Sequence, residues 1–264
     1  MDEPYIWSIG GSSQYGEISQ TLFEFQEHFS YGTGSPTCDA MVLVTGMEMC
    51  TVQGGHQLCN VQGKANVGSA CNDWIKYAVC EDKAYSYSIV RTMAHELAHI
   101  LGCVHDGEQA LRGLQYRGHP GSQSCNYNEG FIMSYIEQDT KQFRFSSCCS
   151  KTIQFFSRLP ESICLRQNNT GTSTANSVYL PGRSVSLDLL CQQHYKDTGH
   201  TLRHDSGKPN ITCKVHCIGA RHNGRTPLGT IYAPDGSSCG QRRSDTICVR
   251  GECVSDRRFS GPTY

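Results

Sequence analysis

The 264-residue sequence predicts a mixed α/β (α+β) domain with a mixed sheet, followed by a small, irregular, disulfide-rich domain. An apolar stripe at helical spacing from Ile89 to Leu101 and an apolar run from Ala40 to Gly46 indicate a packed first domain. The last third has few long apolar runs and is rich in Gly, Pro, Cys and charge. A polar stretch of small residues lies between these parts. We therefore predict a first domain at 1–166, a linker at 167–178 and a second domain at 179–264.

The best-defined element is a helix that ends near Gly102. Ser86 or Ser88 is expected to cap its start, and Gly102 allows the chain to leave it sharply because glycine lacks a Cβ. The apolar stripe of this helix consists of Ile89, Met93, Leu97, Ile100 and Leu101. This pattern buries one face and leaves the histidines of the helix directed into a cleft.

The run from His95 to Asp106 reads HExxHxxGxxHD, which is the zinc-binding pattern of a metzincin endopeptidase. His95 and His99 are four residues apart and share a helix face, so both imidazoles can bind one Zn²⁺. The turn at Gly102 returns His105 as the third ligand. The alternative is that these histidines are ordinary polar residues of a surface helix, but it does not explain the glycine and third histidine at fixed offsets.

Three protein ligands leave one position of a single catalytic zinc ion open for water. Glu96 follows the first ligand and is predicted to be the general base, which takes a proton from water and passes it to the leaving amine. Asp106 would close the open position if it were a fourth ligand. We therefore expect Asp106 to orient or anchor the turn.

Further segments resemble the reprolysin (adamalysin) branch of the metzincins, which includes the ADAM and ADAMTS proteases and snake-venom metalloproteases. Residues 130–135 resemble the Met-turn, with Met133 beneath the zinc ligands. Residues 22–29 resemble an amphipathic helix that precedes the central strand at 40–46, and 145–149 resemble the end of the catalytic domain. Residues 65–71 resemble the edge strand that pairs with substrate, which implies that Val67, Gly68, Ser69 and Ala70 bind substrate.

Less sequence precedes His95 than in a typical reprolysin catalytic domain, so the resemblance implies an N-terminally truncated form. Residues 1–7 are short and polar, and they do not form a signal peptide. No stretch approaches the length of an apolar membrane span. We therefore expect a chain without a membrane span.

Sixteen cysteines, an even number, predict a disulfide framework and a secreted, extracellular protein. Ten of them precede residue 167 and six follow residue 178, so each predicted domain can pair internally. Local spacing suggests Cys71 with Cys80 and Cys103 with Cys125. A competing interpretation is a metal-binding pair at Cys213 and Cys217, although no clear partner pair accompanies it.

The second domain is similar to the disintegrin-like and cysteine-rich segments of ADAMTS proteases at 180–192, 235–240 and 248–254. A short catalytic domain joined to such a tail also resembles the salivary reprolysin-like proteases of ticks, which implies cleavage of matrix or clotting proteins such as fibronectin or fibrinogen. The tail could contact matrix or acidic glycans through Arg242, Arg243, Arg257 and Arg258. The net charge of −1 gives glycan binding no global support, and scattered surface charge is the simpler account of these arginines. We expect no nucleic-acid partner.

Two functions from different classes follow. The first is a secreted zinc endopeptidase acting on extracellular proteins; the resemblance also admits Ca²⁺, which no residue pattern here shows. The second is a catalytically inactive, truncated protease that acts as a cysteine-rich binding, adhesion or anticlotting module. The presence of Glu96 favours the enzyme, because an inactive protein has no chemical need for the base.

Overall fold

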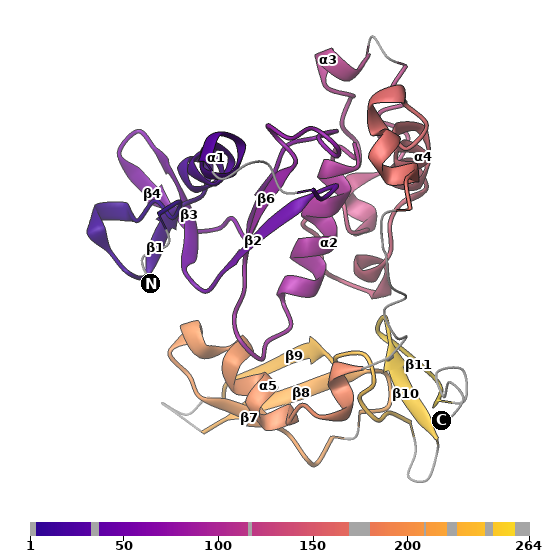
Figure 1. Cartoon of the computed structure of the whole chain (residues 1–264). Helices are drawn as coiled ribbons and strands as arrows, with labels where there is room; N and C mark the ends of the chain where they lie inside the picture. The colour runs from indigo at the N-terminus through magenta and orange to yellow at the C-terminus, as the bar shows by residue number, and fades with distance from the viewer. Residues whose placement is uncertain are drawn as a thin grey trace. The chain divides into compact units, whose positions relative to one another are not determined.

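A computed structural model of the chain describes residues 4–32, 37–115, 118–168, 180–208, 210–220, 226–240 and 245–256. The chain divides into two compact units, seen in Figure 1. The first comprises Met1–Asp82 and Ile89–Asn169, and the second comprises Lys83–Ser88 and Thr170–Tyr264. Most of the predicted linker lies outside the described residues, as do Arg242, Arg243, Arg257 and Arg258.

A three-stranded mixed sheet organises the first unit. Strand β6 (Tyr77–Glu81) lies between β2 (Met41–Thr45), to which it is parallel, and β5 (Gly63–Ala65), to which it is antiparallel. All five residues of β6 are buried, as expected for a strand covered on both faces. Tyr77 and Val79 pack on the side of helix α1 (Ile18–Glu27), and Ala78 packs with Ile100 of helix α2 (Ile89–Ile100).

The predicted helix at 22–29 is confirmed, although it begins earlier, at Ile18. Glu17 caps it, because its side chain accepts a hydrogen bond from the backbone N–H of Gln20. The prediction that 40–46 forms the central strand is wrong within the described residues, where β6 is central and β2 lies at the edge. Val44 of β2 is correspondingly exposed.

A second sheet of the first unit joins three short strands. Strand β1 (Tyr15–Glu17) runs parallel to β3 (Glu48–Gln53), which forms an antiparallel hairpin with β4 (His56–Leu58). Gly54 and Gly55 form the turn with φ of 57° and 81°, which glycine adopts at no steric cost. The disulfide between Cys50 and Cys59 closes the same hairpin.

The remaining elements of the first unit are short. The helices are α3 (Arg112–Gln115) and α4 (Ser147–Phe156). A π-helix η2 spans His28–Gly32, and 3-10 helices are η1 (Ile9–Gly11), η3 (Tyr127–Glu129), η4 (Thr140–Phe143) and η5 (Pro160–Arg166).

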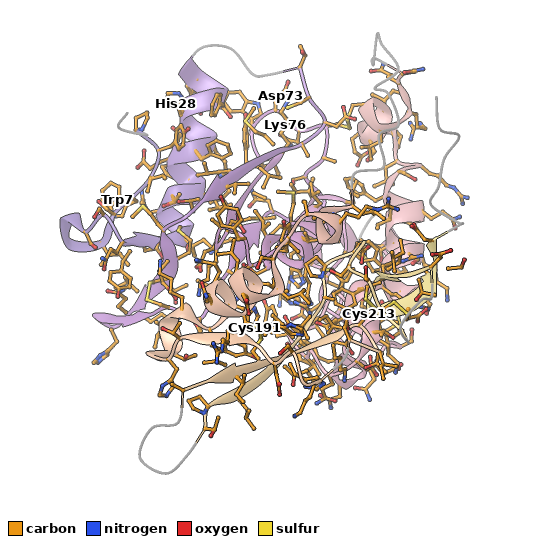
Figure 2. All side chains as sticks on the ribbon, turned by 90° about the horizontal axis from the view of Figure 1, so that it is seen from below. Trp7, His28, Asp73, Lys76, Cys191 and Cys213 are labelled. Atoms are coloured by element: carbon orange, nitrogen blue, oxygen red, sulfur yellow. A yellow bond between two sulfur atoms is a disulfide. The ribbon has the colours of Figure 1, made fainter. Side chains whose placement is uncertain are left out.

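A buried lysine precedes β6: Lys76 is 1% exposed, and its Nζ lies 2.6 Å from Asp73 Oδ1 (Figure 2). This pairing compensates for the burial of the ammonium group.

Four disulfides cross-link the first unit, and both predicted local pairs are wrong. Cys71 pairs with Cys164, Cys103 with Cys149, and Cys125 with Cys148. Cys80 is a free, buried residue within β6, and Cys38 is also free. Proximity in sequence did not predict the disulfide pairing of Cys103 and Cys125, because α4 brings the adjacent residues Cys148 and Cys149 to these two different partners.

The second unit contains more regular structure than the irregular domain that we predicted. Strands β7 (Leu202–His204), β8 (Lys214–Gly219) and β9 (Leu228–Tyr232) form an antiparallel sheet, and β10 (Thr246–Val249) and β11 (Glu252–Ser255) form a hairpin. Helix α5 (Leu187–His194) and the turns η6 (Pro181–Arg183) and η7 (Lys196–Thr198) complete it. These strands are difficult to recognise in the sequence because cysteines, and not aliphatic residues, occupy several of their buried positions, as Cys217 does in β8.

Three disulfides join elements of the second unit: Cys191–Cys217, Cys213–Cys248 and Cys239–Cys253. Cys191 and Cys213 are labelled in Figure 2. The alternative metal pair at Cys213 and Cys217 is therefore wrong, because both sulfurs form disulfide bonds. Tyr87, in the segment Lys83–Ser88, packs against the core of this unit. No helix in the described part of the chain is long and apolar enough to cross a membrane.

Candidate metal centre

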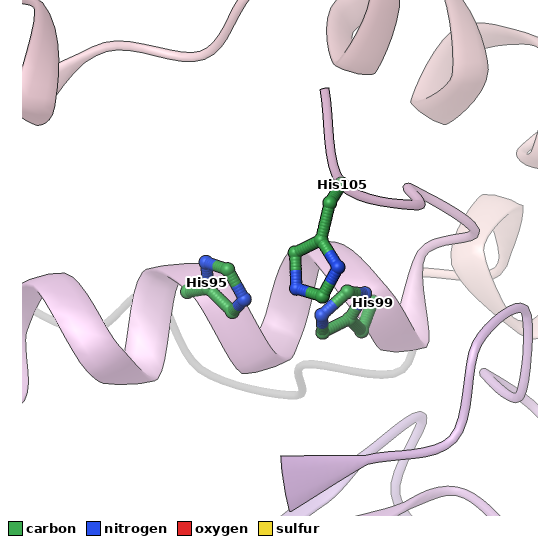
Figure 3. A group of neighbouring side chains, drawn as sticks. All are labelled: His95, His99 and His105. Carbon is green, nitrogen blue, oxygen red and sulfur yellow. The ribbon is translucent and has the colours of Figure 1, made fainter. Parts of the chain in front are cut away.

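Helix α2 presents His95 and His99 from adjacent turns of one face, and His105 meets them from the segment that follows the helix (Figure 3). The rings of His95 and His99 have centroids 4.7 Å apart, and the His105 ring lies 5.2 and 4.8 Å from them. The nearest ring nitrogens all lie within 4.8 Å of one another. The three residues predicted as metal ligands are therefore brought together.

Gly102 makes this convergence possible. Its φ is 100°, in a region that L side chains rarely adopt, and the chain leaves the helix there. A Cβ at this position would also lie 3.3 Å from the Phe156 side chain. The sharp exit and the close packing against α4 together require glycine.

We expect Gly102→Ala to lower the free energy of unfolding by about 1–3 kcal/mol, because it adds backbone strain and a tight contact with Phe156. The measurement is denaturant unfolding of the full chain. Gly113→Ala is the matched control, because Gly113 has no positive φ and nothing within 4 Å of an added Cβ. Equal destabilisation by the two substitutions would contradict this account of Gly102.

The hydrogen bonds of the histidines direct the same nitrogen of each ring toward the others. His95 Nδ1 lies 2.7 Å from the carbonyl oxygen of Ile132, and His99 Nδ1 lies 2.7 Å from that of Cys103. A carbonyl oxygen only accepts, so Nδ1 carries the hydrogen in both rings and the lone pair is on Nε2. In His105, Nδ1 lies 3.1 Å from Glu108 Oε1, which selects the same tautomer.

The surroundings keep two of these rings neutral. Burial lowers the pKa of His95 to about 3, and the nearby His99 acts in the same direction. Burial likewise lowers the pKa of His99 to about 4, although the hydrogen bond to Cys103 opposes this shift. Neutral imidazole is the form that binds a metal ion, so these sites need no deprotonation at neutral pH.

Glu96, the predicted general base, lies buried beside the histidines. It is 4% exposed, and its Oε2 has no hydrogen-bond partner among the described residues. Burial raises its pKa to about 8, and the positive charge of Lys64 acts in the opposite direction. Gly63 of β5 covers the carboxylate so closely that a Cβ there would lie 2.5 Å from Glu96 Oε1.

These features fit a metal ion. Three converging imidazoles form the donor set of a catalytic zinc site, and the partnerless Glu96 oxygen is available to a bound water. The carbonyl partners of His95 and His99 are of the kind that fix the rings of metal ligands. The donor chemistry therefore suits zinc better than calcium, which prefers oxygen.

Met133 and Asp106 connect the site to the core beneath it. Met133 is fully buried with Ala98, Cys103 and Cys149, and its carbonyl oxygen accepts a hydrogen bond from the backbone N–H of Asp106. Asp106 Oδ1 accepts from Ser146 Oγ at 2.6 Å, and Ser146 caps α4. Asp106 thus ties the segment of the third histidine to the Met133 turn and to α4.

The disulfide between Cys103 and Cys149 occupies the same region. It joins the segment after α2 directly to α4. No free thiolate from Cys103 is therefore present to compete for a metal ion at the histidines.

The residues predicted to bind substrate lie beyond the edge strand. Strand β5 ends at Ala65, so the prediction of an edge strand at 65–71 is wrong. The backbone N–H groups of Gly68, Ser69 and Ala70 donate to the carbonyl oxygens of His99 and Ile100. These N–H groups satisfy carbonyl groups at the end of α2, and Val67 precedes them in the same turn. Substrate binding by these four residues stays a prediction.

Three residues of this site had no individual role predicted from the sequence. Gly63 covers Glu96, Glu108 accepts from His105, and the Tyr135 hydroxyl lies 3.1 Å from His105 Nε2. The contact of Glu108 with His105 could be inferred from the local sequence, because Glu108 follows His105 by three residues. Tyr135 follows Met133 by two residues, but its approach to His105 depends on the path of the turn. Gly63 is distant in sequence from all of them.

The comparisons with known proteins agree with this geometry. The model of metallo-peptidase family M12 (Reprolysin_5) matches residues 3–146, more than half of the chain. A Bombyx mori protein named "a disintegrin and metalloproteinase with thrombospondin motifs like" is 30% identical over 239 residues, which cover 87% of this chain and 32% of that protein. Venom metalloproteinase BumaMPs1 of Olivierus martensii is 32% identical over 117 residues, covering 44% and 27%.

A more divergent mouse relative covers a similar region. "A disintegrin and metalloproteinase with thrombospondin motifs 16" from Mus musculus is 27% identical over 221 residues, which cover 82% of this chain and 16% of that protein. This chain thus spans about a third or less of the length of these three curated relatives. The family match covers more than half of the chain, and the chain therefore belongs to the reprolysin-like metallo-peptidases of family M12.

Proposed function

We propose that this chain is a zinc-dependent metalloendopeptidase that hydrolyses extracellular proteins. One observation carries the proposal: three imidazole lone pairs converge beside a buried carboxylate that has one oxygen without a partner among the described residues. His95, His99 and His105 would hold the ion. A bound zinc ion supplies Lewis-acid chemistry, because it makes water acidic near neutral pH and polarises the scissile carbonyl.

Glu96 performs the proton transfers in this proposal. Its partnerless Oε2 accepts a proton from the attacking water, and the same carboxyl later donates it to the leaving amine. Burial alone favours the protonated carboxyl, so the adjacent positive charge of an ion is needed to favour the ionised base at neutral pH. No covalent bond between enzyme and substrate forms in this sequence.

The free edge of β5 is the proposed binding site for the substrate backbone. The N–H of Glu81 donates to the carbonyl oxygen of Gln62, and an antiparallel ladder alternates, so Lys64 with Val79 is the next hydrogen-bonded pair. The backbone groups of Gly63 and Ala65 consequently face away from β6. No described strand pairs with that edge, and an extended peptide could add there beside Glu96.

The proposed compartment rests on the disulfides, and the proposed substrate class rests on the family resemblance of the sequence. Seven disulfides in the described part of the chain favour an oxidising, extracellular setting. The second unit, which we take to be a disintegrin-like and cysteine-rich domain, would bind protein substrates. Matrix and clotting proteins, as for the salivary proteases of ticks, are the proposed substrates.

The test is cleavage of gelatin, fibronectin and fibrinogen by the purified, oxidised chain, with metal content measured in parallel. We expect about one zinc ion per chain, the number that three histidines can hold. A chelator should abolish cleavage, and added zinc should restore it. Bound zinc without cleavage of any of the three proteins would favour the non-catalytic binding module instead.

A further inference from the structure

His119 is a buried histidine outside the metal cluster, and it bonds to the turn that follows α2. It is 8% exposed, and its Nε2 lies 2.8 Å from the carbonyl oxygen of Gly102. Its Nδ1 accepts a hydrogen bond from the backbone N–H of Gly121 at 3.0 Å. Because a carbonyl oxygen only accepts and a backbone N–H only donates, the ring hydrogen is on Nε2. The ring therefore donates to Gly102, and both of its nitrogens are satisfied.

The segments around His119 hold this donor in place. The ring meets Phe155 of α4 edge-on, with centroids 5.9 Å apart and an interplanar angle of 77°. Gly121, which bonds to the other ring nitrogen, has a φ of 67°, and a Cβ there would lie 3.2 Å from the backbone nitrogen of Ala110. The position of the ring is therefore set by contacts within the protein and does not depend on a bound ion.

The carbonyl group of Gly102 belongs to the peptide unit between Gly102 and Cys103, from which two parts of the metal site extend. The Cys103 carbonyl oxygen lies 2.7 Å from His99 Nδ1 and accepts from it, and His105 follows Cys103 by two residues. The N–H of this peptide unit donates to the carbonyl oxygen of Ala98 at 2.9 Å. The hydrogen bond from His119 fixes the opposite side of the same peptide unit.

The flexibility of glycine makes this second bond important. Gly102 is buried with a φ of 100°, and glycine can adopt more backbone conformations than any other residue. Without His119, its buried carbonyl oxygen would lose this donor, which disfavours the present orientation of the peptide unit. A rotated peptide unit would displace both the oxygen that orients His99 and the start of the segment that carries His105.

We propose that His119 is a positioning residue of the metal site, which holds the turn at Gly102 so that His99 and His105 converge on one ion. It touches neither the ion nor a substrate and acts only through the peptide unit after Gly102. This inference rests on the proposed metal site and deepens it.

The experiment compares two polar replacements, His119→Asn and His119→Gln. The shorter asparagine can accept from Gly121 in place of Nδ1 but does not reach Gly102, whereas the amide nitrogen of glutamine can take the place of Nε2 and donate to Gly102. Each variant keeps one of the two hydrogen bonds, so a general loss of packing is matched. His56→Asn in the exposed strand β4 is the control for the substitution itself.

The zinc dissociation constant of the oxidised full chain is measured by competition with a chromophoric chelator. We expect His119→Asn to raise it by about tenfold, the lower end of the effect of losing a group that supports metal ligands. His119→Gln and His56→Asn should remain close to the wild type. The absorption bands of bound Co²⁺, which report ligand geometry, should change only in His119→Asn. Thermal unfolding of the apoproteins should show similar losses of stability in the two His119 variants.

A further measurement needs no loss of the side chain. The ¹⁵N–¹H spectrum of the histidine-labelled wild-type chain, assigned by the signal that His119→Gln removes, should show the Nε2–H tautomer of His119. The Nδ1–H tautomer would overturn the inference, even if His119→Asn did not fold.

The outcomes separate this inference from the proposed function. A wild-type zinc dissociation constant in His119→Asn, or equal weakening in His119→Asn and His119→Gln, would show that the bond to Gly102 does not position the ligands, while the zinc endopeptidase would stand. A wild-type chain that binds no zinc would overturn the proposed function and this inference with it.

Discussion

Replacing Glu96 by Gln is expected to lower kcat/KM for protein cleavage by about 10²–10⁴-fold while zinc remains bound, because the proton acceptor is lost and the three imidazoles are untouched. Glutamine has the same shape as the glutamate, and its amide can occupy the buried position without a charge. Stability should therefore not fall. Initial rates on a peptide library, with zinc content determined on the same samples, give the measurement.

The control for Glu96→Gln is Glu24→Gln, an acidic residue of α1 whose side chain pairs with Gln20. This variant should cleave at the wild-type rate. If Glu96→Gln retained full activity with zinc bound, Glu96 would not be the base. If it lost zinc instead, the carboxylate would contribute to metal binding in a way that the present arrangement does not suggest.

Gly63→Ala is expected to reduce kcat/KM by about 100-fold, because displacement of a catalytic group by about 1 Å has an effect of this size. The added Cβ would lie 2.5 Å from Glu96 Oε1 and 2.8 Å from its Cδ, so the carboxylate must move. The carboxylate is the end of a flexible side chain, and Gly63 has no positive φ. We therefore expect little change in the free energy of unfolding.

The control for Gly63→Ala is again Gly113→Ala, where an added Cβ meets nothing within 4 Å. Peptide cleavage and denaturant unfolding are measured for both variants. Wild-type activity in Gly63→Ala would show that Glu96 functions in a displaced position. A large loss of stability would show that the added methyl group displaces the backbone of β5 and not the Glu96 carboxylate.

The sequence predicts the metal site better than it predicts the surrounding fold. His95, His99, Gly102 and His105 are close in the chain, and the helical repeat and one glycine turn determine their arrangement. The contacts made by Met133 and Asp106 depend on longer-range packing. Even so, the Met133 turn could be recognised, because its residues are contiguous.

Features formed by distant segments could not be predicted in this way. Gly63 covers Glu96 only because β5 pairs with β6 in a particular register, and no local pattern determines that register. The disulfide from Cys71 to Cys164 closes a separation of 93 residues, which sequence spacing does not reveal. The edge strand was assigned too late in the chain because its three residues carry no alternating apolar pattern.

The assignment of Lys83–Ser88 to the second unit affects how the protein can be divided for recombinant work. These six residues connect β6 to α2, and Tyr87 among them packs against the second core. A fragment ending at Asn169 would retain this segment but lose the residues that cover Tyr87. The protease cannot be excised cleanly at a single boundary, and shortened versions should be compared with the full chain before activity is attributed to either part.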